Sequence, residues 1–149
     1  GVRTFEAAAF LRRCGADVTR VRKMFREHVE DYRAKGEAIR NAELFREHFA
    51  ISVCPSEGLD SPTVVGAQAA NELLNIIGVK ASFVLTDYRN TIYISARSID
   101  EINVQIVMER LGGGGHLNIA GAQLEHYSIT EAKDVLKQTL QKMLDEGDI

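Results

Sequence analysis

The chain has 149 residues, 45% of them hydrophobic, and a formal net charge of −3. This composition is normal for a soluble globular protein with one domain of ordinary size. The weakly acidic balance argues against long nucleic acid as a partner, and no apolar run approaches the ~18 residues of a membrane span, so we predict a cytoplasmic location.

Residues 1–48 are predicted to be helical and to lie outside the main domain. Short helical patterning over 4–14 is followed by a longer stretch over 18–45. The longer stretch carries apolar residues at seven-residue intervals: Val18, Phe25, Tyr32 and Ile39. If this stretch is one continuous helix, which Gly36 can bend or interrupt, it suits a connector between domains. A surface helix on a single domain is the alternative.

Strand and helix patterns alternate over residues 49–149, which predicts a second domain. In chain order we expect a strand over 49–54, a helix over 61–77, a hairpin of strands over 80–86 and 91–97 with a turn over 87–90, a helix over 103–111, a strand over 122–127 and a helix over 130–144. The predicted fold class is therefore α/β, a mixed β-sheet flanked by helices and preceded by a helical connector.

The strongest functional signal is a run of four glycines, at 112–115, followed by His116. Glycine loses much conformational entropy on folding, so the run indicates that bare backbone is needed there. Successive N–H groups of such a loop can form a nest for an anion, to which His116 can also donate a hydrogen bond. We expect residues 117–121 to add the N-terminal dipole of a short helical turn. This pattern favours a phosphate site over a flexible loop with an incidental histidine.

A second signal is the segment Ser-Ala-Arg-Ser at 95–98, where a predicted strand ends. Ser95 and Arg97 are two residues apart, so they lie on one face of the strand. The planar, charged guanidinium of Arg97 suits a phosphate or a base edge. An ion pair between Arg97 and Asp100 or Glu101 is the alternative.

Asn103 is a third candidate because it directly precedes a predicted helix. It fits an N-cap and a ligand contact equally well. Gln105 and Gln123 give weaker signals. We expect the remaining histidines to be structural or solvated: His28, His48 and His126.

No metal site and no catalytic residue is predicted in this chain. A two-metal hydrolase needs several carboxylates and imidazoles around ions ~3.5–4 Å apart, and the sequence has no DxD, HxxxD or DHH pattern. Cys14 and Cys54 have no CxxC spacing and no histidine cluster beside them. We expect reduced thiols of an intracellular protein, neither a disulfide nor a zinc site.

The glycine run with His116, followed by Ala-Gly-Ala at 120–122, resembles the GGGGH signature of the DHH-associated domain. That domain forms the C-terminal half of DHH-superfamily phosphoesterases, which include RecJ exonucleases, nanoRNases and cyclic-dinucleotide phosphodiesterases. The segment 95–98 is similar to the S-x-R-S segment of this family. Residues 3–17 look like the tail of a preceding DHH domain, which indicates a fragment of a longer protein.

Two further segments, at 58–63 and 120–123, resemble the GdpP-type branch, which hydrolyses cyclic di-AMP. The resemblance implies that the DHH half holds two manganese ions, while the associated half grips the nucleotide. Carried over by position, the implied phosphate-binding residues are Gly112, Gly113, Gly114, Gly115 and His116. The residues implied to bind phosphate, ribose or base are Ser95, Arg97, Ser98 and Asn103.

The predicted function is therefore the substrate-binding part of a manganese-dependent phosphodiesterase that converts cyclic di-AMP to linear pApA, inactive without the DHH domain. The alternatives are a RecJ-like or nanoRNase-like phosphoesterase acting on short RNA or single-stranded DNA, and a non-catalytic nucleotide-binding module. Expected partners are a cyclic dinucleotide or short oligonucleotide, the DHH domain in cis and, in a homodimer, a second copy. The GdpP-type branch implies a membrane-anchored parent protein.

Overall fold

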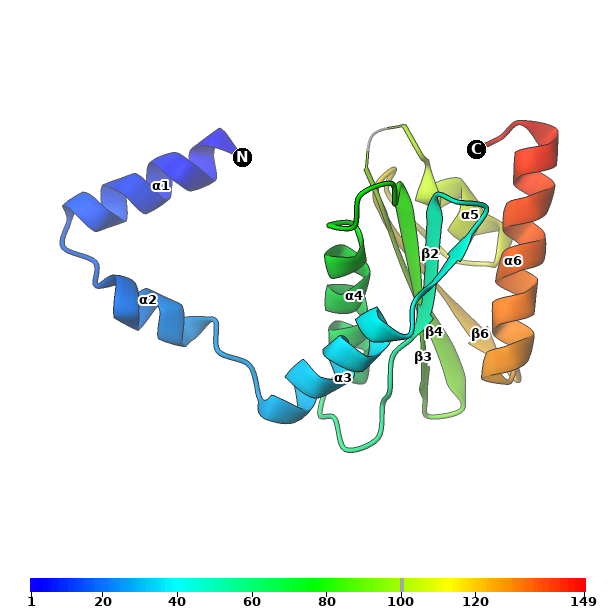
Figure 1. The fold of residues 1–149 in the computed structure, drawn as a ribbon, viewed down its shortest axis with the longest axis horizontal. Coiled ribbons are helices and arrows are strands. Elements are labelled where there is room, and N and C mark those ends of the chain that lie inside the picture. Colours follow the sequence, from blue (N-terminus) through cyan, green and yellow to red (C-terminus); the bar gives the residue numbers. More distant parts are fainter. Residues whose placement is uncertain (100) are drawn as a thin grey trace.

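The computed structural model describes residues 1–99 and 101–149, and within them the core is a six-stranded mixed sheet (Figure 1). The strands are β1 (Glu43–Phe45), β2 (Phe49–Val53), β3 (Ala81–Tyr88), β4 (Thr91–Ser98), β5 (Gly114–Gly115) and β6 (Ile119–Glu125). Their order across the sheet is β1-β2-β3-β4-β6-β5. Strands β2 and β3 are parallel and the other neighbours are antiparallel, which confirms the predicted α/β class with a mixed sheet.

Helices cover both faces of this sheet (Figure 1). On one face lie α3 (Val29–Arg40) and α4 (Pro62–Leu73), and on the other lie α5 (Val104–Arg110) and α6 (Ile129–Glu146). Because strand side chains alternate, Phe83 packs under α5 and α6 while its neighbour Val84 packs under α4. Burial on both faces explains why β3 carries three consecutive apolar residues, Phe83, Val84 and Leu85.

The hairpin between β3 and β4 is tighter than the predicted turn over 87–90. Its two turn residues, Arg89 and Asn90, have φ angles of 53° and 62°. A two-residue turn with left-handed residues matches the natural twist of an antiparallel pair, and asparagine tolerates that conformation well. This turn fixes the register that places Ser95 and Arg97 on the sheet.

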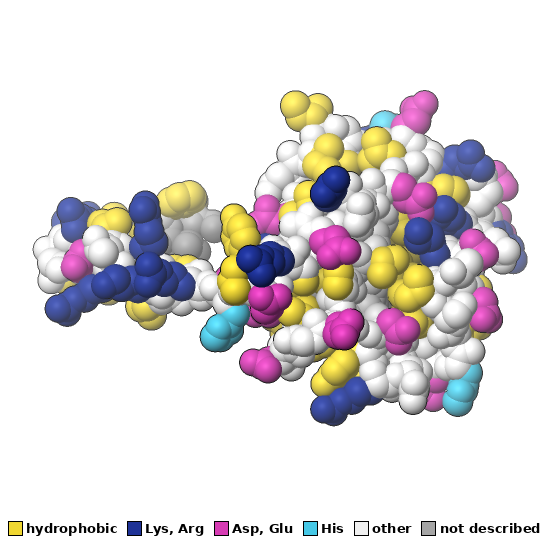
Figure 2. Space-filling view, turned by 60° about the horizontal axis from the view of Figure 1, so that its bottom comes forward, with side chains coloured by type: hydrophobic (Ala, Val, Ile, Leu, Met, Phe, Trp, Pro, Cys, Tyr) yellow, Lys and Arg dark blue, Asp and Glu magenta, His cyan; other side chains and the backbone are white. Residues whose placement is uncertain are grey.

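The two N-terminal helices, α1 (Val2–Arg13) and α2 (Val18–Met24), lie apart from the sheet (Figure 1), and neither buries a residue. In Figure 2 their surface is rich in Lys and Arg, which include the basic residues of both last turns. In α3, by contrast, Ala34 and Ala38 are buried against α4 and β2. Both α3 and β1 fall within the predicted connector, yet they pack on the sheet.

The predicted continuous helix over 18–45 is wrong, because it is broken at residues 25–28 and ends before β1. Phe25 and Tyr32 of the apolar stripe are 78% and 68% exposed. Of this stripe only Ile39 packs on the core, so the stripe gives little free energy to hold a long helix together. Glu27, which lies in the break, forms an ion pair with Lys35 of α3 at 2.7 Å.

Helix α6 starts at Ile129, because the Ser128 hydroxyl accepts a hydrogen bond from the Glu131 amide at 3.1 Å. The predicted start of this helix at residue 130 is therefore one residue late. Gly147, with a φ of 76°, ends the helix in a left-handed cap. With 18 residues, α6 is the longest of the described helices, and none of these is apolar enough over a sufficient length to cross a membrane.

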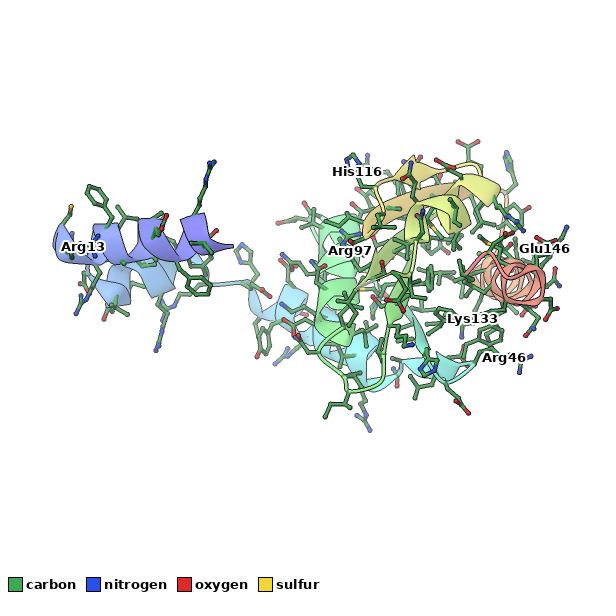
Figure 3. All side chains as sticks on the ribbon, turned by 90° about the horizontal axis from the view of Figure 1, so that it is seen from above. Arg13, Arg46, Arg97, His116, Lys133 and Glu146 are labelled. Carbon is green, nitrogen blue, oxygen red and sulfur yellow. The ribbon has the colours of Figure 1, made fainter. Side chains whose placement is uncertain are left out.

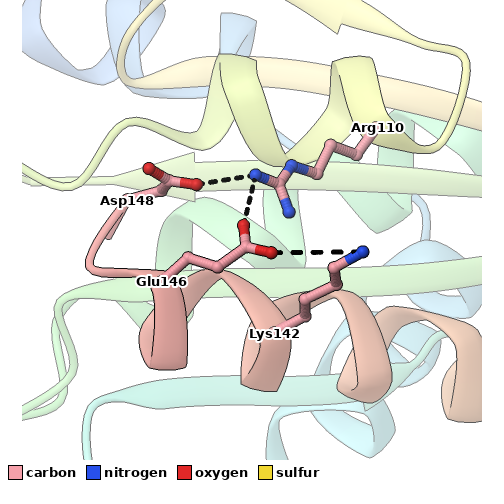
Figure 4. A network of polar contacts seen from close by, with 4 residues as sticks. All are labelled: Arg110, Lys142, Glu146 and Asp148. Carbon is pink, nitrogen blue, oxygen red and sulfur yellow. Dashed lines mark hydrogen bonds and ion pairs between the residues drawn. The ribbon is translucent and has the colours of Figure 1, made fainter.

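Ion pairs tie the edges of the layers together. Arg110 of α5 contacts Glu146 at 2.9 Å and Asp148 at 2.6 Å, which fixes the C-terminal turn (Figure 4). The Glu43 carboxylate of β1 forms an ion pair with the Lys137 ammonium of α6 at 3.0 Å. This contact is the main reason why the pKa of Glu43 is lowered. These pairs are partly exposed to solvent, so they position the elements more than they stabilise the fold.

Candidate functional site

The central strands of the sheet are covered by α5 and α6 on one face and are only partly covered on the other. Alternate residues of β4 and β6 pack under α5 and α6: Ile92, Ile94, Ala96, Ala120, Ala122 and Leu124. The residues between them, which include Ser95, Arg97 and Gly121, therefore lie on the α4 side. Each of these three is half-buried. Period-two spacing thus brings two of the predicted site residues to one face.

Strand register arranges the candidates in two rows across that face. Arg97 pairs with Ile119, whose carbonyl accepts the His116 amide at 2.7 Å, so Arg97, Ile119 and His116 form one row. In the next row Ser95 pairs with Gly121, which pairs with Gly114. Figure 3 shows the Arg97 and His116 side chains on the side of the sheet away from α6. The two predicted signals, far apart in sequence, meet at one end of the sheet.

Residues 117–121 do not form the predicted helical turn. Leu117 and Asn118 are the loop of a β5–β6 hairpin, and β6 begins at Ile119. The alternation of buried and exposed residues along β6, with pairing to β4 at seven positions, outweighs any local helical tendency. No helix dipole therefore points at the glycine run, and the predicted start of this strand at Ala122 is three residues late.

The fold itself requires the first two glycines of the run. Gly112 has a φ of 82° and ends α5, and the Gly113 amide donates to the Met108 carbonyl at 2.8 Å. This is a Schellman end, in which a left-handed glycine satisfies the last carbonyls. A Cβ atom on Gly113 would stand 2.1 Å from the carbonyl oxygen of Gly121. Because the amides of Gly112, Gly113 and His116 all bond within the protein, they cannot form the predicted anion nest.

The other two glycines differ from each other. Gly115 has a φ of 148°, and a Cβ atom there would lie 2.5 Å from the Cα of Ala120. Gly114 has no such restriction, since a Cβ atom there would meet no heavy atom within 4 Å. Gly114 is thus the one glycine of the run whose bare backbone the fold does not need. It pairs with Gly121 in the Ser95 row, so it lies next to a residue on the α4 side of the sheet.

Arg97 is held in place by neutral oxygens. Its Nε atom donates to the Asn71 side chain at 3.1 Å, and Nη1 donates to the carbonyls of Ala96 at 2.8 Å and Ala120 at 3.5 Å. Within the described residues Nη2 donates no hydrogen bond. Burial lowers the pKa of Arg97, but a guanidinium stays charged in proteins. Among the residues that are placed, Arg97 is therefore a fixed cation with one nitrogen left without a partner.

The alternative for Arg97 was a surface ion pair. Glu101 forms no contact with it, and Asp100 lies outside the described residues. Among the residues that the structure places, Arg97 has no carboxylate partner. An unneutralised, half-buried guanidinium is suited to an anionic ligand.

Ser98 and Asn103 are not brought into the Arg97 row. Ser98 is buried on the α5 side, where its hydroxyl donates to the Ile102 carbonyl at 2.6 Å. Asn103 caps α5, with Oδ1 accepting from the amides of Gln105 at 3.0 Å and Ile106 at 3.3 Å. The predicted N-cap is confirmed. Both side chains fix the segment that supports the β5–β6 hairpin, and a direct ligand contact by either stays a prediction.

A cleft of about 480 Å³ lies beside the glycine run. This volume is typical of sites for small ligands. Its principal side chains come from α4, β4 and β6: Thr63, Tyr93, Ser95, Gln123 and Glu125. Three of them were not predicted from the sequence: Thr63, Tyr93 and Glu125. Tyr93 nevertheless continues the two-residue spacing of Ser95 and Arg97 along β4. Thr63 had no local signal, because only the tertiary fold brings α4 over β4.

Ser95 differs from the other serines of the central strands. Ser82 and Ser98 donate to backbone carbonyls at 2.6 Å each, and Ser52 donates to the Ala38 carbonyl. The Ser95 hydroxyl has no hydrogen-bond partner among the placed residues, and Thr63 has none either. Both hydroxyls line the cleft and are therefore available to hydrogen-bond a polar ligand.

Over 1–99 and 101–149, no three His, Cys, Asp or Glu side chains converge in a way that could hold a metal ion. Burial, with a smaller contribution from Glu37, raises the pKa of the Cys54 thiol to about 11. A thiol with this pKa is protonated at neutral pH and is a poor nucleophile. The described residues thus fit a binding site and do not fit a manganese site.

Comparison with known protein families identifies the family of this chain. A family model described as the DHHA1 domain matches residues 48–143. The chain belongs to the DHHA1 domain family. The match covers the sheet from β2 through most of α6, and it includes the glycine run and Arg97.

Curated relatives of this DHHA1 domain are longer proteins. It is 41% identical over 149 residues to the cyclic-di-AMP phosphodiesterase GdpP of Bacillus subtilis, covering 99% of the chain and 23% of that protein. It is 41% identical over 137 residues to the cyclic-di-AMP phosphodiesterase PdeA of Listeria monocytogenes, covering 91% of the chain and 21% of that protein. The chain thus spans about a fifth of the length of these relatives.

Solved structures share the fold of this DHHA1 domain. An exopolyphosphatase-related protein from Bacteroides fragilis matches with a TM-score of 0.80 and 22% identity, over 96% of this chain and 44% of that one. The C-Ala domain of Aquifex aeolicus alanyl-tRNA synthetase matches with a TM-score of 0.50 and 19% identity, over 67% of this chain and 97% of that domain. At these identities the likeness shows the fold alone.

Proposed function

We propose that this DHHA1 domain binds cyclic di-AMP for a phosphodiesterase of the DHH superfamily. The observation that carries the proposal is the row of Arg97, Ile119 and His116 beside a cleft with a bare glycine floor. The names of the relatives at 40–41% identity supply the ligand, since three of them are cyclic-di-AMP phosphodiesterases. Short oligonucleotides stay the alternative ligand.

The geometry suits a phosphodiester placed above Ile119. Neighbouring strands lie ~4.8 Å apart, so Arg97 on β4 and His116 beyond β5 stand on opposite sides of Ile119 within reach of one phosphate. The free Nη2 of Arg97 donates to a phosphate oxygen, and the exposed imidazole of His116 donates to another. The Ser95 hydroxyl adds a neutral donor one row further along.

In this proposal the domain positions the dinucleotide and does not perform the chemistry. Two manganese ions would supply activation of water and polarisation of the phosphodiester, and the described residues offer no ligands for them. Holding one phosphate fixes the orientation of the other at the reacting centre, which accounts for a large share of rate acceleration in general. We therefore expect the 149-residue chain alone to bind cyclic di-AMP without hydrolysing it.

A calorimetric titration tests the proposal. His116→Ala should lower the affinity of the chain for cyclic di-AMP about ten-fold, because a hydrogen bond to a charged phosphate is lost. The matched control is His28→Ala, since His28 is exposed and makes no side-chain cap hydrogen bond at the start of α3. Equal affinity of the two variants would contradict the assigned role of His116, and adding a short single-stranded RNA as competitor separates the two ligand classes.

A further inference from the structure

The two ends of the cleft carry opposite charge. At one end the cleft is lined by Ser95, and the row of Arg97 and His116 lies just beyond it; the other end is lined by Glu125 on β6. Tyr93 and Gln123 pair directly across β4 and β6, between Ser95 and Glu125. Arg97 and Tyr93 are four residues apart on one strand, which is ~13 Å at ~3.3 Å per residue. A ligand with one anionic and one neutral end thus has a single favourable direction in this cleft.

The neutral part of the cleft is polar and unpartnered. Gln123 is exposed on β6, and in the part of the chain that the structure describes its amide makes no hydrogen bond. Tyr93 is half-buried, and its ring packs against that of Tyr88 with centroids 6.4 Å apart. The Tyr93 ring is thereby fixed as a wall, while the Gln123 amide is free to donate and to accept.

The floor beside these side chains is flat. Gly121 has no side chain, and even a Cβ atom there would stand 2.9 Å from the Ile94 carbonyl oxygen. A planar aromatic ring can therefore approach the sheet closely at this point. With a phosphate held at Arg97, the Glu125 carboxylate repels any second anion from the far end, so a base is directed toward Tyr93 and Gln123.

Given the proposed function, we infer that Gln123 reads the edge of the base and makes this cleft selective for adenine over guanine. A glutamine amide makes paired hydrogen bonds to the amino group and ring nitrogen of adenine, N6 and N7. Guanine presents two acceptors, O6 and N7, at the same edge, so the amide oxygen of Gln123 has no donor to meet. Tyr93 contributes ring contact, which is similar for both bases.

The test compares cyclic di-AMP with cyclic di-GMP on the 149-residue chain and on two variants. Titrations followed by amide NMR spectra report weak as well as tight binding. The unmodified chain should bind cyclic di-AMP at least about ten-fold more tightly, since a bidentate pair discriminates on that order. Gln123→Leu should reduce this preference to about two-fold or less. Gln138→Leu is the matched control, on the exposed surface of α6, and should leave the preference unchanged.

The outcomes distinguish a failure of the role of Gln123 from a failure of the proposed function. A full preference for cyclic di-AMP in Gln123→Leu would overturn the role of Gln123. Equal binding of both dinucleotides by the unmodified chain would overturn adenine selectivity, and tighter binding of cyclic di-GMP would point to Glu125 as the reader of guanine. If neither dinucleotide binds the unmodified chain, the proposed function fails, and this inference fails with it.

Discussion

Replacing Arg97 with alanine should lower the affinity of the chain for cyclic di-AMP by roughly 10- to 100-fold. Arg97 is fixed by the Asn71 side chain and by the carbonyls of Ala96 and Ala120, so its free nitrogen needs no reorganisation to meet a phosphate. No carboxylate among the described residues competes for it. Titration calorimetry of the variant against the unmodified chain measures this loss.

Two further variants make the Arg97 result specific. Arg97→Lys keeps the charge but loses the planar fork, so its affinity should fall between those of the other two proteins. Arg13→Ala removes an exposed arginine of α1, which lies far from Arg97 and His116 in Figure 3, and should bind normally. Normal affinity in Arg97→Ala, with an unchanged melting temperature, would remove Arg97 from the site.

The glycine run should respond very differently to alanine at adjacent positions. Gly113→Ala should destabilise the fold by at least about 2 kcal/mol, since its Cβ atom collides with the carbonyl oxygen of Gly121 and with Ala122. Gly114→Ala should change stability by no more than about 0.5 kcal/mol, because its Cβ atom meets open space. The same Gly114→Ala chain should nevertheless bind cyclic di-AMP about ten-fold more weakly, because the added methyl group stands in the ligand's path.

Chemical denaturation and calorimetric titration of both variants measure these effects. The result at Gly114 is the informative one, since it separates a glycine kept for the fold from a glycine kept for a ligand. A Gly114→Ala chain that is stable and binds cyclic di-AMP normally would show that the ligand does not approach the backbone there.

Local sequence signals predicted those elements whose structure depends mainly on the residues of one short segment. The β3–β4 hairpin, α4 and the Asn103 cap of α5 each have such a signal in the sequence. Strands β1 and β5 were missed, because three and two residues are too few to show a period, and only pairing with a neighbour makes them strands. The stretch over 18–45 is not one helix because, of its apolar stripe, Val18, Phe25 and Tyr32 are exposed and only Ile39 packs on the core.

The candidate site was predictable to the extent that it follows strand alternation. Ser95 and Arg97 share a face by their spacing, and the same spacing extends to Tyr93. The meeting of Arg97 with His116 depends on the register of three strands, which no local pattern gives. Asn71 and Thr63 come from α4, and their place beside β4 is a property of the packed layers.

Mapping the ligand on the chain by amide NMR tests the central claim most directly. When cyclic di-AMP is added, we expect the largest chemical-shift changes at the amides of Ser95, Arg97, Gly114, His116 and Gly121. The amides of α6, on the opposite face of the sheet, should stay unchanged. Shifts concentrated on α5 and α6, with the glycine run unaffected, would contradict the assignment of the site.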